Sequence, residues 1–104
     1  MELTGKQRAY LRSLCNTLQP VLYIGKDGVT ENVIASAAEA LRARELIKGR
    51  VLEASLLTAR EACDALCEAC RAEGVQVIGN KFVLYKRNEK EPKIELVSER
   101  KKKK

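Results

Sequence analysis

Histidine is absent from this chain of 104 residues, and aromatic residues are few, with three tyrosines and one phenylalanine. Without histidine, a serine or cysteine nucleophile has no imidazole to act as its base. The acidic residues mostly stand beside basic ones on helical faces, as on a solvated surface, so no carboxylate pair is singled out for acid–base chemistry. The sequence therefore argues against an enzyme, and it indicates no cofactor and no small-molecule substrate.

Long apolar runs are also missing. No segment approaches the roughly 18 consecutive apolar residues that a membrane-spanning helix needs. Residues 1–14, MELTGKQRAYLRSL, carry charges throughout and lack the apolar segment of a secretory signal. We therefore expect a cytoplasmic chain with no membrane partner, whose thiols stay reduced. The cysteines expected to be free are Cys15, Cys63, Cys67 and Cys70.

Positive charge is concentrated at the C-terminal end, and the net charge is +6. Residues 1–85 hold 11 basic and 10 acidic side chains, whereas residues 86–104 hold 9 basic and 4 acidic ones. Such an asymmetry is typical of a protein that binds a polyanion, usually nucleic acid. We expect one domain over residues 1–87 and a charged, lysine-rich tail over residues 88–104. For the run Lys101–Lys104 alone, a solubilising tail or a remnant of cloning is the alternative.

Hydrophobic periodicity predicts an α/β fold of the two-layer α+β type, in the order α-β-α-β-α-β-β. The first helix carries an apolar stripe of Leu11, Leu14, Cys15 and Leu18, and it ends at Pro20. The second begins after Thr30, an N-cap followed by Glu31. Its buried face is formed by Ile34, Ala37, Ala38 and Leu41.

Two capping boxes mark the starts of the first and third helices. Thr4 is followed three residues later by Gln7, and Thr58 is followed in the same way by Glu61. In such a box each side chain bonds an otherwise unpaired backbone N–H at the helix start. The third helix is expected over residues 59–73, with Gly74 ending it.

Four strands are expected, at residues 21–24, 46–52, 75–78 and 82–85. The first is short, apolar and of the fully buried type, and the second has Leu46, Ile47, Val51 and Leu52 on its apolar side. Crossover connections make the first three strands parallel, and the tight turn at Gly79 and Asn80 makes the last two a hairpin. The result is a mixed four-stranded sheet. Another short edge strand is possible at Ile94, Leu96 and Val97.

Three cysteines recur on one face of the third helix. Cys63, Cys67 and Cys70 are spaced by four and three residues, beside Leu66. The Cys67-x-x-Cys70 spacing is also used by metal and redox sites, but structural zinc needs four ligands and often takes histidine. The pattern favours cysteines that pack as small buried hydrophobic residues, with metal or redox chemistry as the alternative.

A glycine loop follows the first strand, with the sequence Gly25, Lys26, Asp27 and Gly28. A loop that enters a helix N-terminus suits phosphate, because unpaired N–H groups and the positive end of the helix dipole meet there. Lys26 adds a mobile cation, whereas the Asp27 carboxylate repels a phosphate unless it turns away to bond the loop. The motif alone leaves two interpretations open, a plain connecting turn and a site for a nucleic-acid backbone.

Basic residues accompany this loop along the chain. Because aromatic residues are few, phosphate and shape recognition would have to dominate over base stacking. Each basic residue alone is also compatible with a solvated surface charge. The candidates are Lys6, Arg8 and Arg12 in the first helix, Arg42 and Arg44 at the end of the second, Lys48 and Arg50 in the second strand, and Lys81, Lys86 and Arg87 around the last strand.

Four stretches, in order, resemble the YhbY family of small bacterial RNA-binding proteins, each a single CRM (chloroplast RNA splicing and ribosome maturation) domain. They are LTGKQRAYLRSL at 3–14, PVLYIGKDGVTENV at 20–33, ELIKGRV at 45–51 and VQVIGNKFVLYKR at 75–87. The resemblance implies a fold like the C-terminal domain of translation initiation factor three, with a G-x-x-G loop likened to that of KH domains. Lys48 is the lysine of the ELIK stretch. Gly49 departs from the larger, often β-branched residue expected there, so the second strand is expected to be looser.

Family members associate with precursors of the large ribosomal subunit, and plant relatives act in intron splicing. The resemblance therefore implies a partner RNA, namely ribosomal RNA or a pre-large-subunit particle. A monomer is the default expectation, because the sequence does not indicate an oligomeric state. A module that binds a ribosomal protein or assembly factor is the main alternative, and DNA binding is a lesser one.

Overall fold

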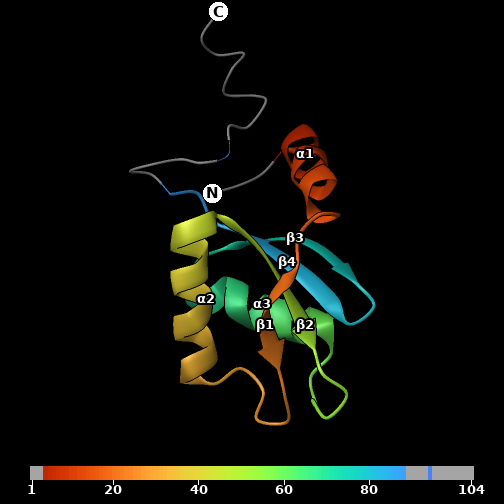
Figure 1. Cartoon of the computed structure of the whole chain (residues 1–104), viewed down its shortest axis with the longest axis vertical. Helices are drawn as coiled ribbons and strands as arrows, with labels where there is room; N and C mark the ends of the chain where they lie inside the picture. Colours follow the sequence, from red (N-terminus) through yellow and green to blue (C-terminus); the bar gives the residue numbers. More distant parts are fainter. Residues whose placement is uncertain (1–3, 89–93, 95–104) are drawn as a thin grey trace, which may run out of the picture.

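The computed structural model describes residues 4–88 and residue 94, and it follows the expected order of elements (Figure 1). The confirmed order α-β-α-β-α-β-β consists of α1 (Gly5–Cys15), β1 (Pro20–Ile24), α2 (Glu31–Arg44), β2 (Leu46–Val51), α3 (Ala59–Cys70), β3 (Glu73–Ile78) and β4 (Lys81–Tyr85). Among the described residues, no helix is long and apolar enough to cross a membrane.

The four strands form one mixed sheet in the order β1-β2-β4-β3. β1 and β2 are parallel, and β4 is antiparallel to both of its neighbours, β2 and β3. The first three strands therefore run in one direction, as the crossover argument predicted, and β4 is inserted between the second and third. Gly79 has a φ of 59° in the turn between β3 and β4, a conformation that glycine adopts at little cost. The predicted hairpin is confirmed.

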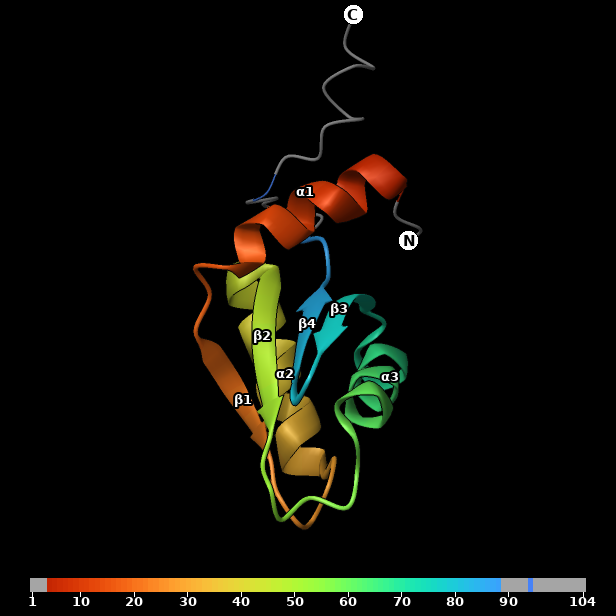
Figure 2. The same ribbon diagram turned by 90° about the vertical axis from the view of Figure 1, so that its right-hand side faces the viewer.

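Each face of the sheet packs against different helices. α2 and α3 cover one face over a core that includes Ile24, Ile47, Leu66 and Phe82. α1 crosses one end of the opposite face (Figure 2). There it forms a second, smaller cluster, made of Leu11, Cys15, Leu46, Val75, Val83 and Tyr85. Among the described residues, no helix lies over the rest of that second face.

Both predicted capping boxes are present. The Gln7 N–H donates to Thr4 Oγ1 over 3.1 Å, and the Thr4 N–H donates to Gln7 Oε1 over 2.9 Å. The same pair of bonds joins Thr58 and Glu61, at 3.1 and 2.9 Å. α1 nevertheless stops at Cys15, because a turn follows it, and the expected continuation to the proline is wrong.

The predicted end of α3 is also wrong. The helix ends at Cys70, and Arg71 adopts the left-handed conformation, with a φ of 58°. Gly74 lies inside β3 instead, where a Cβ would stand 3.1 Å from Cys63 Sγ. This glycine therefore permits close approach of strand and helix and does not end the helix.

Two predictions about buried strand faces need correction. Tyr23 is 52% exposed, so β1 is not fully buried: it is an edge strand of the sheet and only its other face is packed. In β2, Leu46 faces α1 whereas Ile47 faces α2 and α3, so the strand has apolar residues on both sides. Leu52 lies beyond the strand and is 39% exposed.

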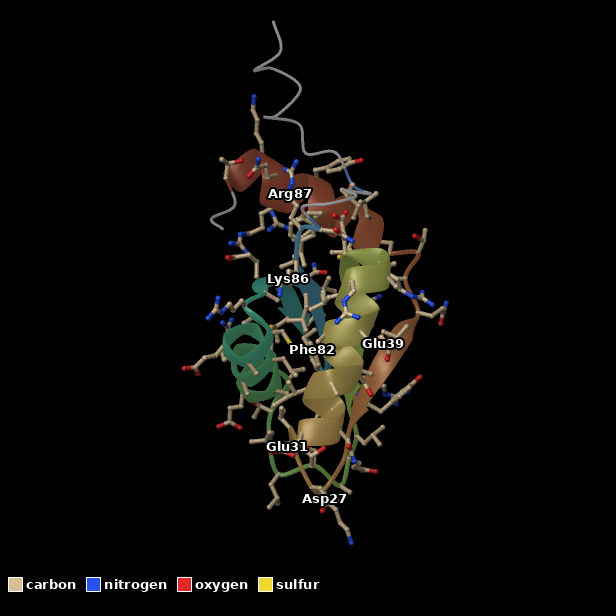
Figure 3. All side chains as sticks on the ribbon, turned by 90° about the vertical axis from the view of Figure 1, so that its left-hand side faces the viewer. Asp27, Glu31, Glu39, Phe82, Lys86 and Arg87 are labelled. Atoms are coloured by element: carbon tan, nitrogen blue, oxygen red, sulfur yellow. The ribbon has the colours of Figure 1, made fainter. Side chains whose placement is uncertain are left out.

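The sequence predicted that Gly49 would loosen β2, and this prediction is wrong. It pairs with Phe82 across the sheet, and a Cβ at position 49 would lie 2.3 Å from Phe82 Cζ. The phenylalanine ring, 1% exposed, therefore occupies the space that a larger residue would need. Figure 3 shows Phe82 on the side of the sheet covered by α2 and α3.

Of the apolar residues expected to form a C-terminal edge strand, only Ile94 belongs to the described residues. Ile94 lies in a bend, not in a strand, and packs against the smaller cluster. Leu96, Val97 and the Lys101–Lys104 run lie outside the described residues.

Candidate nucleic-acid interface

The glycine loop is a closed turn between β1 and α2. The Gly28 N–H donates to the Gly25 carbonyl oxygen over 3.0 Å, and Gly28 has a φ of 73°. This bond holds Lys26 and Asp27 at the exposed tip. Thr30 then caps α2 by accepting a 3.2 Å hydrogen bond from the Val33 N–H. The loop is thus a well-defined turn that presents two charged side chains to solvent.

The internal bonds of the loop restrict how it could hold a phosphate. The Gly28 amide is used in closing the turn, and Glu31 already places a carboxylate in the first turn of α2. With Asp27, two carboxylates therefore lie near the positive end of the helix dipole (Figure 3). The Lys26 side chain is the group of this loop best suited to an anion.

The connection between β2 and α3 supports the loop, which the sequence gave no reason to expect. A Cβ on Gly28 would lie 3.5 Å from Leu57 Cδ1, so the two segments are in contact. Ser55 Oγ accepts from the Leu57 N–H over 3.0 Å and orders the connection. Leu56 is 90% exposed beside it. No periodicity marks such a contact, because it joins two irregular segments.

Most of the predicted basic residues fall into two groups at opposite ends of the sheet. Figure 3 shows Asp27 of the loop at one end and Lys86 and Arg87 at the other. The loop-end group is Lys26, Arg50 and Lys81, of which Arg50 and Lys81 pair across β2 and β4. Lys48 lies nearer the middle of the sheet, paired with Pro20 at the start of β1 and close to Cys15 at the end of α1. The far-end group is Lys6, Arg8 and Arg12 on α1, with Lys86 and Arg87 after β4.

Within the far-end group, Arg8 makes a hydrogen bond that joins two elements of the fold. The Arg8 guanidinium donates to the carbonyl oxygen of Gly74 and so ties α1 to β3. Arg42 and Arg44 lie exposed in the last turn of α2, where a cation is favoured by the helix dipole. The basic residues that the sequence offered as candidates therefore do not lie together, and only the loop-end group adjoins the glycine loop.

The cysteines are free, as predicted. Cys63 and Cys67 face each other with 4.0 Å between their sulfur atoms, and this contact lowers the pKa of Cys63 and raises that of Cys67. Burial raises the pKa values of Cys15 and Cys70. Within the described part of the chain, no group of three or more His, Cys, Asp or Glu residues is arranged to hold a metal ion.

A buried acid, Glu45, was not singled out by the sequence. Its side chain is fully buried after α2, and its carboxylate oxygens accept from the Asn88 and Ile94 N–H groups, each over 2.7 Å. Its carbonyl oxygen also accepts from the Lys86 N–H over 2.9 Å. Glu45 therefore fixes the chain that leaves β4. Its φ of 67° at a helix end without glycine has no signal in the sequence.

The fold and the loop define a class of small α/β domain in which a G-x-x-G turn joins the first strand to the following helix. The family model of the CRS1/YhbY (CRM) domain matches residues 3–86. The chain belongs to this family.

Individual relatives agree with this assignment. The chain is 46% identical over 94 residues to "Probable RNA-binding protein YqeI" of Bacillus subtilis, covering 90% of this chain and 98% of the relative. A Haemophilus influenzae protein named "RNA-binding protein" is 39% identical over 94 residues, covering 90% and 94%. The solution structure of the hypothetical protein SAV1595 from Staphylococcus aureus matches with a TM-score of 0.76 and 44% identity, covering 91% and 99% of the two chains.

Proposed function

We propose that this protein binds RNA without catalysing a reaction, and that its loop end contacts the phosphate backbone. The observation that carries the proposal is the position of Lys26, held at the tip of a closed turn at the end of the sheet where Arg50 and Lys81 are exposed. The names of two relatives, which call them RNA-binding proteins, support it. Cations grouped in this way attract a polyanion by releasing its counterions.

The RNA we propose is ribosomal RNA in a precursor of the large subunit, bound in the cytoplasm by a monomer. The four stretches shared with the YhbY family support this choice. The same stretches support residues 1–87 as the RNA-binding domain, followed by a charged tail over residues 88–104. The protein would then assist ribosome assembly by binding, since binding phosphates needs no reactive group.

Filter binding to ribosomal RNA fragments over a range of salt tests the proposal. A protein that contacts about five phosphates of a single strand should lose roughly a hundredfold in affinity between about 50 and 200 mM salt. Lys26→Ala should weaken binding and lower the salt slope by about 0.7, because one phosphate contact is lost. Lys26→Arg should keep the wild-type affinity and the wild-type salt slope. Lys86→Ala is the comparison at the far end of the sheet. Affinity that does not change with salt, or no RNA retained at all, would refute the proposal.

A protein-binding function is the second candidate, because Leu56 is 90% exposed beside the glycine loop. An exposed leucine at a loop tip can dock against an apolar surface of a ribosomal protein or assembly factor. This function predicts that Leu56→Ser abolishes association with pre-ribosomal particles, whereas Lys26→Asp leaves the association unchanged after nuclease treatment. RNA binding predicts the opposite pair of results.

A further inference from the structure

The part of the sheet that α1 leaves uncovered carries one row of exposed side chains. Tyr23 pairs with Arg50, Arg50 with Lys81, and Lys81 with Ile78, so the row crosses all four strands. Tyr23 is 52% and Ile78 63% exposed, and both cations are exposed. Strands lie about 4.8 Å apart, so the row spans roughly 14 Å. It begins two residues before the glycine loop.

A pocket of about 360 Å³ opens beside this row, between the sheet and the end of α1. Val83 forms an apolar part of its wall, and Lys48 and Lys81 bring two cations to it. Three carboxamides also line it, from Asn16, Gln76 and Asn80. Carboxamides both donate and accept hydrogen bonds, so they match the mixed donor and acceptor edge of a nucleobase.

The charge of this face favours an anionic occupant. Glu73 is the one acidic residue in the four strands, and it pairs with Tyr85 at the end of the sheet that α1 covers. The row and the pocket therefore hold three cations, Lys48, Arg50 and Lys81, and no carboxylate from the strands. A phosphate on this surface meets attraction from several side chains, and a nearby carboxylate, Glu53, comes after β2 and shares a hollow with Arg50 and Asn80.

We propose that this face holds a single-stranded segment of RNA, with one base stacked on the Tyr23 ring and another in the carboxamide pocket. Arg50 and Lys81, between the two, bind the connecting phosphates. The inference rests on the proposed RNA binding and adds the form of RNA that is recognised. The bases of a duplex are stacked and paired, so they cannot reach the ring or the pocket, whereas unpaired bases can.

The absence of tryptophan from the chain supplies a direct probe. Tyr23→Trp places a single indole in the row, and its fluorescence should be quenched when a single-stranded oligoribonucleotide binds. A blunt duplex of the same sequence should compete poorly. Tyr23→Ala should weaken single-strand binding by between about five- and a hundredfold, the usual range for one stacked base, and Tyr23→Phe should retain the affinity.

Two exposed arginines give a matched pair of charge variants. Arg50→Ala should weaken single-strand binding and lower its salt slope by about 0.7. Arg60→Ala, on α3 and away from this face, should do neither. Because Tyr23, Arg50 and Arg60 are all exposed, the variants should keep the wild-type melting temperature, which is measured alongside.

The outcomes separate this inference from the proposed function. RNA bound with full affinity by Tyr23→Ala and Arg50→Ala, or a duplex that competes as well as the single strand, overturns the inference. If Lys26→Ala still weakens such binding, RNA binding itself stands. Failure of the wild-type protein to bind any RNA overturns both.

Discussion

Replacing Gly49 by alanine should destabilise the protein, although strand propensity predicts the reverse. The added Cβ would lie 2.3, 2.6 and 2.9 Å from three carbons of the Phe82 ring. Carbon atoms normally approach to about 3.5 Å, so the ring would have to move by roughly 1 Å. It is 1% exposed and packed in the core beneath α2 and α3, where movement disturbs many contacts.

The net effect is a balance of two contributions. Overpacking a core of this kind costs up to about 3 kcal/mol. Removing a glycine from a strand interior returns roughly 0.5–1 kcal/mol, because the unfolded chain loses freedom. We expect Gly49→Ala to lower the free energy of unfolding by about 2 kcal/mol and the melting temperature by about 10 °C. Urea and thermal denaturation followed by circular dichroism measure both.

A double-mutant cycle identifies the cause. Phe82→Leu removes the outer ring carbons that the new Cβ would meet, so the double variant should be more stable than the sum of the single changes by about 1 kcal/mol or more. Gly5→Ala is the control, because among the described residues no atom outside its own turn of α1 lies within 4 Å of the Cβ it adds. A Gly49→Ala protein as stable as the wild type, or strict additivity in the cycle, would refute the packing argument.

Two further predictions concern buried polar groups. Glu45→Ala should lower the free energy of unfolding by about 3 kcal/mol, since two backbone N–H groups, of Asn88 and Ile94, lose a charged acceptor. Urea denaturation measures the loss, and hydrogen exchange at those two amides should become faster. Unchanged exchange would contradict the prediction. Tyr85→Phe should raise the free energy of unfolding by about 1 kcal/mol, because within the described residues the tyrosine hydroxyl is buried without a hydrogen-bond partner. Burial and the Glu45 carboxylate raise the pKa of Tyr85, so the unfolded chain ionises first and wild-type stability should fall as the pH rises above about 10. Denaturation over that pH range should show a smaller fall in Tyr85→Phe, and identical curves would contradict the assignment.

Local signals in the sequence predicted most element boundaries. The Thr4 and Thr58 capping boxes, the Thr30 cap and the Gly79 turn depend on residues three or fewer positions apart, so sequence alone could identify them. The end of α3 was mispredicted because Arg71 took the left-handed conformation that glycine usually supplies. That choice depends on how the chain must turn to enter β3.

The candidate site divides in the same way. The sequence located the G-x-x-G loop between a strand and a capped helix, and it supplied every cation of the loop-end group. It could not separate Lys26, Arg50 and Lys81 from the cations of the far end, because the separation depends on strand order and register. The sequence also predicted that the first strand, and so Tyr23, is buried. Tyr23 is exposed because it lies on an edge strand and on the uncovered face of the sheet.

The sequence by itself determined the order of the helices and strands, the place of the glycine loop between a strand and a capped helix, and the membership of the CRM family, because these depend on local pattern and on motifs in order. Only the tertiary structure explained why positions 49 and 74 are glycine. At each position, a side chain from another segment occupies the space that a Cβ would need. The tertiary structure also decided which face of the sheet stays open. That face is set by where α1 crosses the strands, and helix placement depends on contacts far apart in the chain.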